Sequence, residues 1–168
     1  MVGVDGSPGS LEALRYALLE ARRLDATLIP VHAWQPPGGE IAARRAPSAG
    51  YERIVREMEE ERFMRAFDEG LGGLPTDVVV EPWLVRGAAG PALVEAAAHH
   101  NDLLVVGAGR RGRLRHPLSA GTVRYCLAHA ACAVVAVPPP SLQAEIPTQL
   151  RLRASADRLV HELTHAHH

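Results

Sequence analysis

Short apolar runs alternate with longer segments of helical periodicity along most of this chain, and this alternation constrains the fold more than any other feature. The apolar runs predict strands at residues 1–5, 27–33, 78–85, 103–106 and 133–137. Helical periodicity predicts helices after Ser7 and at residues 51–69, 91–100 and 120–130. Strands that are apolar on both faces, with helices between them, are typical of a parallel sheet covered on both sides. We therefore expect an α/β fold with a doubly wound, Rossmann-like, five-stranded parallel sheet and helices on both faces.

The chain length predicts one such domain followed by a short extension. A chain of 168 residues suits a single α/β core, which we expect to occupy residues 1–140. Within it, Pro82 indicates an edge or a bend in the third strand, and residues 35–50 predict a mobile loop. Apolar residues recur at helical spacing in the tail and predict a C-terminal helical extension at 141–168.

Composition and charge exclude several classes of function. The formal net charge of -1 gives no argument for a nucleic-acid or membrane partner, and no apolar run approaches a membrane span. The chain contains no lysine, which excludes a Walker P-loop and Schiff-base chemistry. No secretory signal precedes the first strand, so we expect a cytoplasmic protein with Cys126 and Cys132 as free thiols.

A glycine- and arginine-rich loop follows the fourth predicted strand and indicates an anion-binding site. Its sequence, GAGRRGRLRHPLSAGT from Gly107 to Thr122, holds four glycines and four arginines. Glycines let backbone N–H groups approach an anion, and the start of the next helix adds its dipole. Doubly wound sheets bind ligands where the winding reverses, which places this loop opposite Asp5-Gly6-Ser7. The alternative for the arginines is a solvated basic surface, and for Asp5 a turn that caps the first helix.

Three segments of the chain resemble the universal stress protein family. They are Val4-Asp5-Gly6-Ser7, Val31-His32-Ala33 and Leu103 to Pro138, so the likeness spans nearly all of residues 1–138. Nucleotide-binding members carry glycines in a Gly-two-Gly-nine-Gly-Ser/Thr spacing. Here eight residues separate Gly112 from Gly121-Thr122, and Pro117 lies among them.

The resemblance implies a regulatory stress-response module that binds ATP, AMP or ADP, with Mg²⁺ if ATP is bound. By this resemblance Asp5 lies near the adenine and ribose, the backbone of Ala33 meets the adenine, and the loop glycines contact the phosphates. The candidate nucleotide-binding residues are Asp5, Ser7, Ala33, Gly87, Gly107, Gly109, Arg110, Gly112, Gly121 and Thr122.

The sequence contains no constellation that predicts an enzyme. Ser7 lacks a His–acid relay, Gly-x-Ser-x-Gly is absent, and Glu59-Glu60-Glu61 is typical of a solvated helix face. We therefore expect no catalytic residues and no metal site, with slow incidental ATP hydrolysis at most. An adenylate-forming or pyrophosphatase enzyme is a weaker alternative, because the loop after the first strand only faintly resembles theirs.

The last predicted strand, Ala133 to Val137, indicates a homodimer. It is short and apolar, and as a sheet edge it would expose unpaired backbone groups. Family members that resemble this chain pair that edge with its twin. The altered loop spacing and Pro117 favour a second function for such a dimer, namely a nucleotide-free interaction protein with the same fold.

Overall fold

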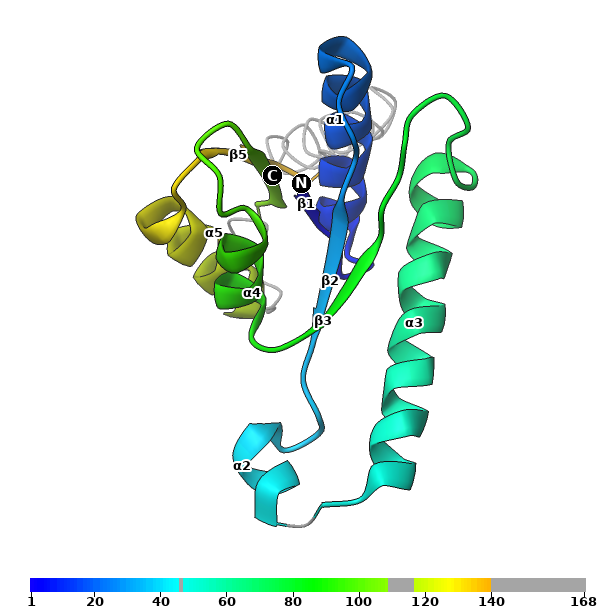
Figure 1. Ribbon diagram of the computed structural model, residues 1–168, viewed down its shortest axis with the longest axis vertical. Coiled ribbons are helices and arrows are strands. Elements are labelled where there is room, and N and C mark those ends of the chain that lie inside the picture. Colours follow the sequence, from blue (N-terminus) through cyan, green and yellow to red (C-terminus); the bar gives the residue numbers. More distant parts are fainter. Residues whose placement is uncertain (46, 109–116, 140–168) are drawn as a thin grey trace, which may run out of the picture.

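A five-stranded parallel sheet forms the centre of the molecule, and helices cover both of its faces (Figure 1). The computed structural model describes residues 1–45, 47–108 and 117–139. The strands are β1 (Val2–Gly3), β2 (Pro30–Trp34), β3 (Trp83–Arg86), β4 (Leu103–Gly107) and β5 (Ala133–Val137). The helices are α1 (Pro8–Leu24), α2 (Gly39–Arg45), α3 (Ala49–Leu71), α4 (Ala89–Ala96) and α5 (Pro117–His129).

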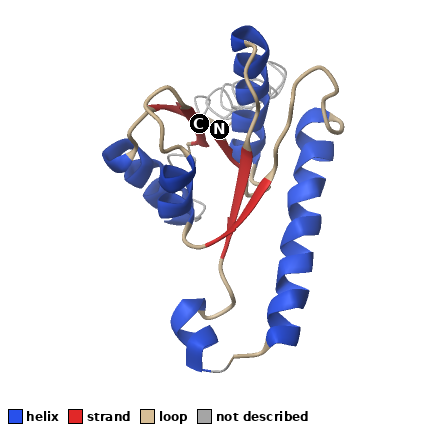
Figure 2. Cartoon of the chain, viewed as in Figure 1, coloured by secondary structure: helices blue, strands red, loops and turns tan. Residues whose placement is uncertain are grey.

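The strand order confirms the predicted doubly wound sheet. The order is β3-β2-β1-β4-β5 and every pairing is parallel, so β1 lies between β2 and β4. The chain first winds outward from β1 to β3 and then returns to β4 on the other side of β1. Figure 2 shows the strands in red with helices on either side. The winding therefore reverses between β1 and β4.

The core has two layers, because alternate residues of each central strand face opposite sides of the sheet. In β4, Leu103 and Val105 pack in the layer beneath α1 and α3. Leu104 and Val106 pack in the other layer, with α4 and α5. Both faces of the central strands are thus buried, which explains their continuous apolar runs.

The structure corrects several predicted boundaries. The first strand covers only Val2–Gly3, and the third begins at Trp83 instead of residue 78. Pro82 lies between β3 and an isolated bridge of Leu28 with Val80, and β3 is an edge strand of the sheet, which was one of the two expectations for Pro82. The predicted mobile loop contains a helix, α2.

Local sequence explains where the first helix begins. Ser7 is its N-cap, in an extended conformation, and the Ser7 Oγ accepts a hydrogen bond from the Ser10 backbone N–H. Pro8 follows at the first helical position, where its missing N–H costs nothing. The expected cap at Ser7 is confirmed, and it fixes the chain direction just after β1.

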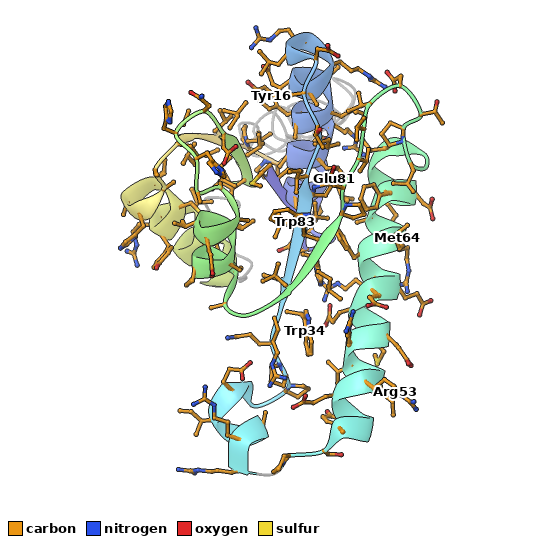
Figure 3. All side chains as sticks on the ribbon, in the orientation of Figure 1. Tyr16, Trp34, Arg53, Met64, Glu81 and Trp83 are labelled. Carbon is orange, nitrogen blue, oxygen red and sulfur yellow. The ribbon has the colours of Figure 1, made fainter. Side chains whose placement is uncertain are left out.

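An arm made of α2 and the N-terminal part of α3 extends beyond the sheet (Figure 1). Helix α2 buries none of its residues, and Arg86 ties it to the sheet. The Arg86 guanidinium contacts Glu40 and Glu52 at 2.9 Å each and lies 5.8 Å from the Trp34 ring centroid. Figure 3 shows Trp34 at the end of β2, between the sheet and this arm.

Three further expectations concern the cysteines, membrane spans and the C-terminal extension. Cys126 and Cys132 are free thiols, as expected. Within residues 1–45, 47–108 and 117–139, no helix is long and apolar enough to span a bilayer. The predicted extension at 141–168 lies outside the described residues.

Candidate functional site

A cleft opens at the carboxyl end of the sheet, at the point where the winding reverses. Its cavity volume is about 170 Å³. The cleft is lined by Gly3, Val4, Asp5, Ser7, Ser10, Val31, Ala33, Ala89, Leu93, Val106, Gly107 and Thr122. These residues come from β1, β2 and β4, from the turn after β1, and from helices α1, α4 and α5. Such a position is where open α/β sheets bind their ligands.

The cleft brings together half of the residues predicted from the sequence. The predicted residues that line it are Asp5, Ser7, Ala33, Gly107 and Thr122. Two others, Gly87 and Gly121, are described but are not among the lining residues. The Gly87 N–H donates to the Trp34 carbonyl at 2.8 Å, which makes it part of the turn after β3. Gly109, Arg110 and Gly112 lie outside the described residues.

Asp5 is held in a tight turn at the end of β1. Its Oδ1 accepts a hydrogen bond of 2.9 Å from the Ser7 backbone N–H, across Gly6 at φ 75°. The Asp5 backbone N–H donates to the Ser10 Oγ at 3.3 Å, and that hydroxyl donates to the Ser7 carbonyl. The turn and the first helical turn therefore brace each other beside the cleft.

These contacts keep the Asp5 carboxylate ionised. Burial opposes ionisation, but hydrogen bonds from Ser7 and Ser10 and the charge of Arg62 outweigh it. The net effect holds the pKa of Asp5 below its ordinary value. Because the pKa is lowered, the carboxylate is charged at neutral pH and protonates only as the pH falls through this lowered value. It can accept hydrogen bonds from ligand hydroxyl groups.

The remaining walls of the cleft are mainly apolar. Val31, Ala33 and Val106 come from the strands, and Ala89 and Leu93 come from the first turns of α4. The two α4 residues were not predicted from the sequence, although their spacing of one helical turn was a signal that they share a face. An apolar slot beside a fixed carboxylate suits a ligand in which a flat, weakly polar ring is joined to a group that carries hydroxyls.

Gly107 has a structural role that was not predicted from the sequence. A Cβ atom added there would lie 2.5 Å from the carbonyl carbon of Gly9 and 2.8 Å from the Ser10 nitrogen. The end of β4 and the first turn of α1 thus meet backbone to backbone. This close packing of β4 on α1 requires glycine at residue 107. The requirement is independent of any ligand that approaches there.

The described residues offer little for a resident metal. Among residues 1–45, 47–108 and 117–139 no group of three His, Cys, Asp or Glu side chains could hold an ion. Among the residues that line the cleft, Asp5 carries a carboxylate that could contact an ion. Any Mg²⁺ here would be held chiefly by ligand phosphates, as is usual for this ion.

Comparison with known proteins shows which family shares this arrangement. The model of the universal stress protein family matches residues 1–138. Universal stress protein Mb2019 of Mycobacterium bovis is 35% identical over 112 residues, which are 67% of this chain and 35% of that protein. This chain therefore spans about a third of the length of that relative.

Solved structures of universal stress proteins share the fold. A universal stress protein in complex with cAMP superposes with a TM-score of 0.50 at 26% identity, over 83% of this chain and 94% of that one. UspA from Lactobacillus plantarum gives a TM-score of 0.56 at 19% identity, over 81% and 94%. Because the family model matches most of its length, this chain belongs to the universal stress protein family.

Proposed function

We propose that this protein binds an adenine nucleotide in the cleft between β1 and β4. The observation that carries the proposal is the composition of the cleft, in which a fixed carboxylate, Asp5, lies beside an apolar slot. The related structure at 26% identity is a complex with cAMP, and this supports an adenine nucleotide as the ligand class.

The proposed orientation follows from the chemistry of the walls. The adenine ring lies in the apolar slot near Ala33 and Leu93, and the ribose hydroxyls donate to Asp5. The phosphates point toward Thr122 of α5 and toward Gly107, which packs on the first turn of α1, where the helix N-terminus favours negative charge.

The finer assignments are part of the same proposal. The ligand is ATP, or AMP or ADP, and Mg²⁺ accompanies the phosphates of ATP. The bound nucleotide acts as a signal in a cytoplasmic stress response, and the protein is a binding module instead of an enzyme. Slow hydrolysis of ATP is compatible with this role.

Analysis of the purified full-length chain tests the proposal. Mass spectrometry of the heat-released small molecules should detect an adenine nucleotide, and added ATP or AMP should raise the melting temperature. GTP at the same concentration is the control for general anion effects. Absence of a co-purified nucleotide, together with no adenine-dependent stabilisation at millimolar ligand, would refute the proposal.

Replacement of Asp5 provides a first prediction for this site. Asp5→Ala should weaken nucleotide binding by about ten-fold or more, since hydrogen bonds to charged groups contribute about 1.5–3 kcal/mol. Asp5→Asn is the matched variant, because its amide oxygen still accepts from the Ser7 N–H and only the charge is lost. Calorimetric titration should therefore rank the affinities as wild type, Asp5→Asn and Asp5→Ala. Equal affinities for all three would show that the ribose does not meet this carboxylate.

A second candidate function is a dimeric interaction module, and the position of β5 favours it. Ala133–Val137 is the edge strand of the sheet, and it pairs with β4 on one side. Apolar edge strands tend to pair with another chain. We expect a homodimer through this edge, with or without a nucleotide. Sedimentation of a monomer at micromolar concentration would contradict it.

A further inference from the structure

A buried histidine behind the cleft has no part in the ligand site described above. His32 is 3% exposed and stacks on Phe63 with a ring-centroid distance of 5.4 Å and an interplanar angle of 22°. Its Nδ1 lies 2.7 Å from the Val4 carbonyl oxygen, and its Nε2 lies 2.9 Å from the Glu59 Oε2. Both ring nitrogens therefore face oxygen atoms. Nδ1 faces a backbone carbonyl just after β1, and Nε2 faces a side chain of α3.

The partner at Nδ1 defines one proton of this contact. The Val4 carbonyl can only accept, so Nδ1–H is the donor. At the other nitrogen, Nε2 and the Glu59 carboxyl group share a hydrogen bond of 2.9 Å. A buried ring held at both nitrogens fixes the position of Glu59 relative to the end of β1.

Glu59 in turn lies beside Arg62, an arginine of the same helix that contacts the backbone of Asp5. Arg62 Nη1 is 4.0 Å from Glu59 Oε2, and Arg62 Nη2 donates to the Asp5 carbonyl oxygen at 2.9 Å. The two carbonyls that follow β1, those of Val4 and Asp5, are thus both held by side chains that α3 positions.

We propose that Arg62, paired with a Glu59 that His32 holds in place, is a positioning residue that orients the Asp5 carboxylate into the cleft. The direction of the Asp5 carbonyl fixes the peptide plane between Asp5 and Gly6. That plane limits where the Asp5 side chain points. Gly6 has few steric restrictions at φ 75°, so the turn would have more freedom without this contact. The inference rests on the proposed function, because it explains how a ligand-binding group is oriented.

The test compares two arginines of the same helix. Arg62 and Arg65 have side-chain exposures of 57% and 59%, and each contacts a glutamate of α3. Arg62 also hydrogen-bonds to Asp5. Arg62→Ala should weaken AMP binding by about three- to ten-fold, the range for one net hydrogen bond, whereas Arg65→Ala should change it less than about two-fold. Arg62→Lys, which keeps a cation and a donor, should fall between wild type and Arg62→Ala.

A second measurement needs no ligand. Titration of the Asp5 carboxyl by carbon NMR should show a higher pKa in Arg62→Ala, because Arg62 helps to lower it in the wild type. The Arg65→Ala protein should keep the wild-type value.

The outcomes separate this inference from the proposed function. Wild-type affinity in both alanine variants would overturn the positioning role and leave nucleotide binding intact. If the wild type binds no adenine nucleotide, the proposed function fails. In that case the NMR titration of Asp5 alone tests the contact between Arg62 and Asp5. An unchanged pKa of Asp5 in Arg62→Ala would overturn that contact.

Discussion

Gly107→Ala should destabilise the fold by about 3 kcal/mol, the cost of overpacking a site that cannot relax easily. The added Cβ would meet backbone atoms of Gly9 and Ser10 at 2.5–2.8 Å, and backbone cannot move aside as a flexible side chain can. Either α1 or the end of β4 must shift; α1 packs in one core layer, and β4 contributes residues to both layers. For a domain of this size the melting temperature should fall by about 10 °C.

The same substitution at Gly121 provides the control. A Cβ at Gly121 would meet nothing within 4 Å, and the residue lies in α5. Gly121→Ala should leave stability unchanged or raise it by up to about 1 kcal/mol, because alanine favours helix. Chemical denaturation of both variants measures the difference. Equal stability of Gly107→Ala and Gly121→Ala would contradict the close backbone contact at the cleft.

Ala89→Trp should abolish detectable nucleotide binding while the fold is retained. Ala89 is half-buried at the first position of α4 and lines the apolar slot. An indole there would fill the space proposed for the adenine ring, and we expect affinity to fall by about 100-fold or more, which is about 2.8 kcal/mol. Calorimetric titration with AMP measures the loss.

Ala98→Trp adds the same bulk at an exposed residue that does not line the cleft. It should bind AMP as the wild type does. Circular dichroism of both variants must match the wild type, so that a loss of affinity reports on the slot. Undiminished binding by Ala89→Trp would place the ligand elsewhere on the molecule.

The fold could be predicted because its main signal is local. Alternating apolar runs and helical periodicity identified the elements, and the handedness of crossovers left few strand orders. Helix α2 escaped prediction because it buries no residues and so leaves no hydrophobic periodicity to detect. The short β1 ends early because side chains pair with the backbone groups that follow it: the Val4 carbonyl accepts from His32, and the Asp5 N–H donates to the Ser10 Oγ.

The site was predicted only in part, because several of its determinants are contacts between distant residues. Asp5 and Gly107 lie in recognisable turns, but the packing of Gly107 on Gly9 has no local signature. Glu59 was interpreted as one member of a solvated acidic face. Its neighbours Glu60 and Glu61 are solvated, with side-chain exposures of 48% and 76%, but Glu59 is 26% exposed and contacts His32. That partner is 27 residues away, so the helix sequence alone could not reveal it.

An NMR titration of the isotope-labelled full-length protein with AMP tests the central claim most directly, because it locates the ligand as well as detecting it. Adenine-nucleotide binding in the cleft predicts one saturable transition in which the amide signals of lining residues move together. The signals to follow are those of Gly3, Asp5, Ser7, Ala33, Gly107 and Thr122. The Ala89→Trp protein should show none of these shifts. Unmoved cleft signals at millimolar AMP, or shifts confined to another surface, would contradict the account.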